Sequence, residues 1–134
     1  ILGGNNAKLK ASLLPAIAAG AVIALATEET ARHNPHAVRT TAQRDGAGYR
    51  ISGRKIAVMD GNIAETFIVV ARPQDGSGHL MLVVDAGAPG ITIASRMGID
   101  SRPLVDITFD NVAASELVCD PAETLTLLDA AGCA

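Results

Sequence analysis

The first apolar residues of the chain recur at the spacing of one face of an α-helix: Leu9, Leu13, Leu14 and Ile17. This pattern predicts a helix over residues 6–19, with Asn5 or Asn6 accepting a backbone hydrogen bond as its N-cap. Pro15 lacks an amide hydrogen and clashes with the preceding turn, so we expect a break or a second short helix there. Gly20 is expected to end the segment.

Short apolar or alternating runs fill the middle of the chain, separated by glycine, proline, aspartate and asparagine. They predict about seven strands, over residues 22–27, 37–44, 49–59, 66–72, 80–85, 91–94 and 105–109. Gly53 interrupts the third run and predicts a bulge or a sharp bend. Asp110 and Asn111 are expected to turn the chain after the last run. Strands this short, joined by such turns, indicate an antiparallel barrel or sandwich.

The end of the chain is rich in leucine and alanine. Residues 122–131 predict a second helix, with Asp120 and Pro121 at its beginning. The order is therefore helix, strands, helix. Since the chain begins at Ile1 and stops at Ala134, we expect both ends to be cuts in a longer protein.

Composition adds limits to this picture. The 134 residues suit one domain, and the aromatic share of 2% predicts a core of aliphatic side chains. The net charge of -3 does not favour nucleic-acid binding. The apolar stretch 13–26 is short for a membrane span and is interrupted by Pro15 and Gly20, so no membrane segment is expected. Cys119 and Cys133 match no metal motif and are expected to be free thiols of a cytoplasmic protein, with an incidental disulfide between them as the alternative.

Several short motifs follow one another through the strand region, in this order: Thr27-Glu28, Thr40-Thr41-Ala42, Asp45-Gly46, 49–55, 60–64, 67–72, Pro89-Gly90, 97–99 and 109–112. In this order and spacing they resemble the middle β-domain of the acyl-CoA dehydrogenases, and the resemblance covers nearly the whole chain. It implies a mainly β fold, a flattened antiparallel β-barrel with short helical segments at both ends. By the same resemblance, residues 1–21 end an N-terminal helical domain, 22–118 form the barrel, and 119–134 start a C-terminal helical domain.

The resemblance also implies a cofactor and a reaction. Members of the family bind FAD and dehydrogenate acyl-CoA thioesters between Cα and Cβ. The positions that correspond to the family's flavin-contacting residues are Ala24, Ala26, Thr27, Arg32, His33, Ala57 and Met59. His33 is also the expected contact to the acyl-CoA substrate. The family's catalytic base lies in the C-terminal helical domain, so no catalytic residue is expected in this chain. No metal ligand is expected either.

Several of these positions depart from the family pattern. Glu29 replaces a proline, Arg32 replaces a glycine, Ala57 replaces a tryptophan that stacks on the flavin, and Met59 replaces a small hydroxyl residue. Two hypotheses follow: the middle domain of an FAD-dependent dehydrogenase, or a degenerate, non-catalytic subunit that assembles with a flavin-bearing partner. An unrelated β-barrel binding module is a third. FAD is expected in the intact enzyme and not in this fragment, and the implied partners are acyl-CoA, an electron-transfer flavoprotein and further subunits, alike or unlike.

Individual side chains leave further alternatives open. Arg32 and His33 suit the cofactor's pyrophosphate, or they belong to a solvated loop. His33 and His36 are three residues apart, but no further ligand is suitably spaced for a metal. Glu28 and Glu29 are expected to point to opposite faces and cannot share a site. Three methionines are expected to serve packing and not chemistry: Met59, Met81 and Met97.

Overall fold

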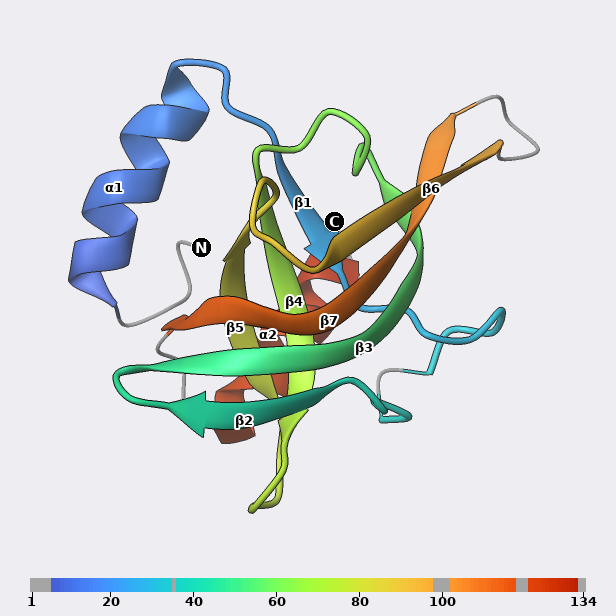
Figure 1. Ribbon diagram of the computed structural model, residues 1–134. Helices are drawn as coiled ribbons and strands as arrows, with labels where there is room; N and C mark the ends of the chain where they lie inside the picture. The colour runs from blue at the N-terminus through green and yellow to red at the C-terminus, as the bar shows by residue number, and fades with distance from the viewer. Residues whose placement is uncertain (1–5, 35, 98–101, 118–120, 133–134) are drawn as a thin grey trace.

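The computed structural model describes residues 6–34, 36–97, 102–117 and 121–132 (Figure 1). Its elements, in chain order, are α1 (Ala7–Ala18), β1 (Ile23–Ala26), β2 (Thr41–Asp45), β3 (Gly48–Met59), β4 (Thr66–Pro73), β5 (Leu80–Asp85), β6 (Ile91–Met97), β7 (Pro103–Leu117) and α2 (Pro121–Gly132). The predicted order of helix, strands and helix is confirmed. The second strand begins later than expected, at Thr41, although Val38 and Thr40 keep the predicted alternation of burial.

Five strands close into a barrel, in the order β4, β2, β3, β7, β5 and back to β4. One edge of β4 pairs with β5, and the other edge pairs first with β1 and then with β2. The two pairings on that second edge are parallel, while the rest of the barrel is antiparallel. The predicted flattened β-barrel with helical ends is therefore confirmed, with β1 and β6 added to its rim.

Strand β7 does not end at Asp110 and Asn111, so the prediction of a turn there was wrong. The two residues lie opposite Ser52 alone, because Ile51 pairs with Val112 and Gly53 pairs with Phe109. Two residues opposite one make a β-bulge, which bends a strand without ending it. Asn111 takes the positive φ of 52° that the bulge needs, a conformation that asparagine tolerates. Beyond the bulge, β7 leaves β6 and pairs with β5.

Helix α1 runs through Pro15 without the predicted break. Pro15 removes only the hydrogen bond to the Ala11 carbonyl, and both helix ends are capped. The Asn6 side chain accepts a 3.0 Å bond from the Leu9 amide. At the other end Gly20 has a φ of 102°, and the amides of Gly20 and Ala21 bond back to Ile17 and Ala16. These caps stabilise the turns on either side of the proline.

Two apolar cores lie on the two faces of β4. The barrel interior holds inward side chains from every barrel strand, among them Phe67, Ile51, Leu82, Ile107 and Val69. The outer face of β4 and β5 carries Ile68, Val70 and Met81, and Leu9 of α1 and Leu128 of α2 belong to this second cluster. Because β4 is buried on both faces, its sequence is a continuous apolar run.

The methionine prediction is correct for one residue of three. Met81 is buried in the second cluster, but Met59 and Met97 are 51% and 84% exposed.

Within the described chain no helix has the length and apolar character needed to cross a membrane.

The bend at Gly53 gives a test of the barrel. Gly53 has a φ of 151°, and a Cβ added there would lie 2.6 Å from the Thr40 Cα. We expect Gly53→Ala to lower the free energy of unfolding by roughly 2–5 kcal/mol, from the left-handed backbone and the overpacking. Gly46 is the matched control, because its φ is also positive but nothing lies within 4 Å of an added Cβ. Gly46→Ala should cost about 1–2 kcal/mol in urea unfolding, and equal losses for the two variants would contradict the packing argument.

Candidate functional site

The segment after β1 is joined to β3 by hydrogen bonds from both main chain and side chain. The Ile56 amide donates to the Glu28 carbonyl at 2.8 Å, and Lys55 Nζ donates to the Thr27 carbonyl at 3.1 Å. Thr27 and Glu28 therefore run alongside Lys55 and Ile56. This contact brings Thr27 next to the strand that carries Ala57.

Ala57 sits in a second bulge, where Ile56 and Ala57 lie opposite Asp106 alone. Its φ is 53°, and its amide donates to Asp106 Oδ1 at 3.1 Å. Arg54 and Arg96 each reach Asp106 Oδ2 at 2.9 Å. Burial alone would raise the pKa of Asp106, but the Ala57 amide and the two guanidinium groups hold it below its usual range. The carboxylate is thus fixed in the ionised form and holds the bulge.

A buried ion pair lies directly behind Thr27. The Lys55 side chain is 0% exposed and the Glu29 side chain 7%, and Nζ and Oε1 are 2.7 Å apart. The Glu29 carboxylate also accepts from the amides of Arg39 and Thr40, at 2.6 and 3.0 Å. Burial would raise the pKa of Glu29, but the bonds from Lys55 and Thr40 hold it below its usual value. We assign the ionised form to both groups, because these donors favour a carboxylate, although burial lowers the pKa of Lys55.

Glu29 was considered in the sequence only as the replacement of a proline, so its ion pair with Lys55 was not predicted. One signal was available in the sequence. Lys55 lies on the same face of its strand as Tyr49, Ile51 and Gly53, the face that turns inward. A lysine at an inward position needs a buried carboxylate partner, and Glu29 fills that role from a distant part of the chain.

The loop between Glu29 and Arg39 carries Arg32 and His33 on the surface. His33 is 73% exposed, and its Nδ1 lies 2.6 Å from Glu28 Oε1. Glu28 thus turns outward to His33 while Glu29 turns inward to Lys55, which confirms that the two carboxylates do not share a site. Arg32 is exposed as well.

The structure brings together some of the predicted residues and separates others. Thr27, His33 and Ala57 are connected through Glu28 and its bond to β3. Met59 is exposed two residues beyond Ala57. The side chains of Ala24 and Ala26 lie in the barrel core, so only their main chain is available to a ligand. Among the described strands β1 pairs with β4 alone, which leaves its second edge outside the sheet.

These features fit a flat ring bound by its edge and by one face. The unpaired edge of β1 and the Thr27 hydroxyl supply polar groups. The exposed Ala57 and Met59 supply an apolar surface, although Ala57 offers a much smaller one than an aromatic residue would. The residues present are therefore compatible with the isoalloxazine ring of FAD.

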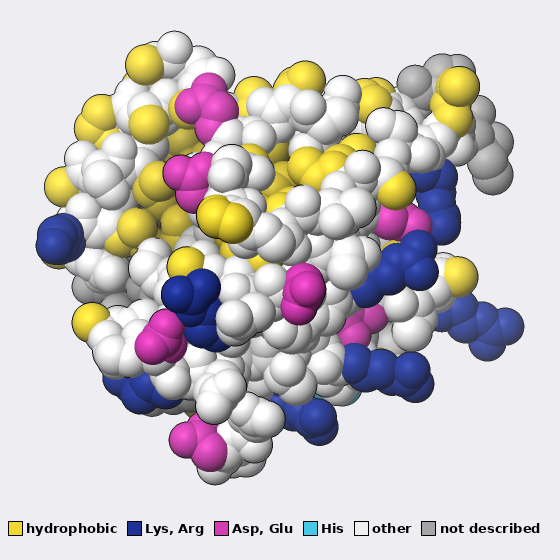
Figure 2. Space-filling model, in the orientation of Figure 1, with side chains coloured by type: hydrophobic (Ala, Val, Ile, Leu, Met, Phe, Trp, Pro, Cys, Tyr) yellow, Lys and Arg dark blue, Asp and Glu magenta, His cyan; other side chains and the backbone are white. Residues whose placement is uncertain are grey.

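Basic side chains lie on the same side of the molecule as this site. Figure 2 shows Lys and Arg gathered on the side where β3, β6 and the loop after β1 lie in Figure 1. These elements carry the exposed arginines Arg32, Arg39, Arg54 and Arg96; Arg50 near the start of β3 is exposed as well but pairs with Asp45. Such a surface suits a ligand that carries phosphate groups.

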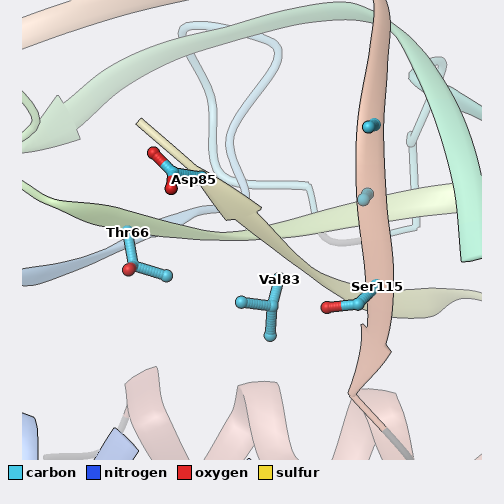
Figure 3. A pocket seen from close by; sticks show the side chains of 6 residues that line it. Thr66, Val83, Asp85 and Ser115 are labelled. Carbon is cyan, nitrogen blue, oxygen red and sulfur yellow. The ribbon is translucent and has the colours of Figure 1, made fainter. Parts of the chain in front are cut away.

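A separate open pocket of about 390 Å³ lies on β4, β5 and β7. Figure 3 shows Thr66, Val83, Asp85 and Ser115 at its walls. None of the predicted site residues lines it, and Asp85 already accepts a 2.7 Å bond from the Gly87 amide. In the part of the chain that is described, no group of three metal-ligating side chains comes together. Cys119, Cys133 and the motif residues 98 and 99 lie outside the described residues.

Comparison with known proteins identifies the class. The family profile described as acyl-CoA dehydrogenase, middle domain, matches residues 24–112. Benzylmalonyl-CoA dehydrogenase of Aromatoleum aromaticum is 32% identical over 87 residues, which are 63% of this chain and 23% of that protein. Probable acyl-CoA dehydrogenase FadE10 of Mycobacterium tuberculosis is 36% identical over 99 residues, 69% of this chain and 15% of that protein.

Solved structures agree with the sequence relatives. Glutaryl-CoA dehydrogenase of Mycobacterium smegmatis in complex with FADH2 is 26% identical, with a TM-score of 0.81 over 96% of this chain and 36% of that chain. The ChsE4–ChsE5 complex of Mycobacterium tuberculosis, at 20% identity and a TM-score of 0.86, shares the fold over 98% of this chain and 37% of that one. The chain therefore belongs to the acyl-CoA dehydrogenase family. It corresponds to the middle domain and spans about a quarter or less of those curated relatives.

Asp106 gives a test of the bulge that presents Ala57. We expect Asp106→Asn to lower the free energy of unfolding at pH 7 by roughly 1.5–3 kcal/mol, because charged hydrogen bonds are lost from a buried site. Asp45 is the matched control, since it pairs with Arg50 at the surface and is 59% exposed. Asp45→Asn should cost less than about 1 kcal/mol.

The same variant has a defined pH dependence. The folded pKa of Asp106 is depressed, so its stabilisation is present above the unfolded pKa of about 3.9 and is lost as the pH falls through the lower folded value. The difference between wild type and Asp106→Asn should therefore shrink in urea titrations below that pH. A difference that stays constant down to the acid transition would contradict the assignment.

Proposed function

We propose that this chain is the flavin-facing middle domain of an FAD-dependent acyl-CoA dehydrogenase that introduces a double bond between Cα and Cβ of an acyl-CoA thioester. When bound, FAD would supply the acceptor for the hydride from Cβ. The base that removes the Cα proton would lie outside this chain. The role of these residues is to bind and orient the two ligands.

The observation that carries this proposal is the hydrogen-bonded contact between residues 27–28 and β3. It places the Thr27 hydroxyl and the free edge of β1 beside the exposed Ala57 bulge, within a barrel matched by the family profile. Thr27 and the main chain of Ala26 would meet the edge of the ring. Ala57 and Met59 would lie near its face.

The exposed basic loop supports a second part of the proposal. Arg32 and His33 would contact the phosphate groups of the cofactor, and His33 would also lie near the acyl-CoA. Both side chains are exposed, and the Glu28 carboxylate holds the His33 ring at Nδ1. Because the two ring nitrogens are distinct, a contact at one of them orients the other for a ligand.

The two helices support a proposal for the domain organisation. Residues 1–21 would end an N-terminal helical domain and 119–134 would begin a C-terminal one, with 22–118 as the barrel between them. In the described chain α1 and α2 contribute leucines to the cluster on the outer face of β4 and β5. An electron-transfer flavoprotein would be the redox partner. The ChsE4–ChsE5 complex joins two differently named subunits, which supports assembly with further subunits, alike or unlike.

The test uses the full-length protein that contains this chain. We expect it to purify with FAD, and an acyl-CoA added without oxygen should bleach the flavin absorbance near the visible maximum. A protein that lacks flavin alone, but acquires it with an unlike subunit, would favour the degenerate, non-catalytic subunit instead. Absence of flavin in both preparations would refute the proposed function.

Arg32 provides a residue-level test of the phosphate contact. We expect Arg32→Ala to weaken FAD binding roughly 10-fold to 100-fold, the usual effect of losing one charge-assisted hydrogen bond. Arg50→Ala is the control, because that side chain is also exposed but pairs with Asp45 at the surface. Equal FAD dissociation constants for the two variants, measured by fluorescence titration of the apoprotein, would assign Arg32 to a solvated loop.

A further inference from the structure

The loop that carries Arg32 and His33 is held at its base by a single carboxylate. Glu29 stands at the start of the loop, and its two oxygens accept the amides of Arg39 and Thr40 at the end. The third donor is Lys55 Nζ, which comes from the barrel wall. The loop is thus closed at its base and bonded there to β3, while Val38 near its end packs in the cluster on the outer face of β4.

Lys55 connects this point to the flavin-facing segment. The same ammonium group donates to the Thr27 carbonyl at 3.1 Å and to Glu29 Oε1 at 2.7 Å. The carbonyl direction fixes the peptide plane between Thr27 and Glu28. The adjoining Glu28 carbonyl is held by the Ile56 amide at 2.8 Å. Lys55 therefore sets the orientation of the backbone at Thr27 from inside the barrel.

A gain in folding stability does not explain why Glu29 and Lys55 are buried together. Two charges buried together gain little over apolar side chains of the same size, because desolvation offsets their attraction. The geometry is more specific than an apolar contact, since the bonds involving Glu29 and Lys55 determine the positions of three separate backbone groups. The pair is suited to orienting backbone more than to stabilising the core.

We propose that Glu29 and Lys55 form a positioning pair that orients Thr27 and the 30–38 loop for FAD, a role that rests on the proposed function. Glu29 takes over, by side-chain bonding, the restraint that a proline would give through a fixed φ. Neither residue touches the cofactor. Their effect on FAD passes through Thr27 and through the base of the loop.

The test separates orientation from stability. Lys55→Met alone leaves a buried carboxylate without its cation and should lower the melting temperature. The double variant Glu29→Leu, Lys55→Met removes both charges and should recover the melting temperature. We expect its FAD binding to remain roughly 10-fold to 100-fold weaker, the scale on which loss of an outer partner weakens the group it orients. Arg50→Met, which breaks an exposed pair on the same strand, is the control and should bind FAD as the wild type does.

A second measurement does not depend on FAD. Amide hydrogen exchange of the apoprotein should be at least roughly 10-fold faster over residues 30–40 in the double variant, with the barrel strands unchanged. If the double variant does not fold, Glu29→Gln should give the same two effects at smaller amplitude. Wild-type FAD affinity in a stable charge-free variant, or unchanged exchange over 30–40, would overturn the positioning role. A wild-type protein without FAD would overturn the proposed function, and the exchange result would still decide whether the pair orders the loop.

Discussion

Closure of the barrel depends on β4 and β7, because each of these strands must satisfy three partners. β4 gives one edge to β5 and divides the other between β1 and β2, while β7 divides one edge between β6 and β5. A strand that changes partner cannot stay regular. The bulge at Asp110 and Asn111 lies where β7 leaves β6 for β5, and it bends the strand toward its second partner.

The candidate site depends on the second bulge between β3 and β7. The bulge at Ile56 and Ala57 exposes Ala57 and lets the Ile56 amide bond to Glu28, outside the ladder between β3 and β7. Asp106 keeps this bulge in place by accepting the Ala57 amide, and two arginines neutralise its charge. The bulge that bends β7 toward β5 and the bulge that exposes Ala57 therefore both lie in the pairing of β3 with β7.

Local sequence signals were sufficient for most elements and insufficient where two segments meet. The Asn6 cap and the apolar run of β4 are local, and each was predicted. Pro15 misled the prediction because capping at both ends outweighs one lost hydrogen bond. Asp110 and Asn111 carry a turn signal that tertiary pairing converts into a bulge. The partnership of Glu29 with Lys55 spans 26 residues, so only the inward position of Lys55 could have suggested it.

The way the 30–38 loop is anchored has a consequence for the evolution of ligand preference. Glu29 bonds the two ends of the loop together and Val38 packs with Ile68 and Val70 of β4, so the exposed residues 30–34 contribute little to the barrel. Substitutions or insertions there would change the chemistry presented to a ligand at small cost in folding, since a longer loop adds only slowly to the closure entropy. Because Glu29 fixes the ends of the loop, the exposed residues between them can be replaced without changing the barrel. Arg32, in the place of a small glycine, is one such replacement.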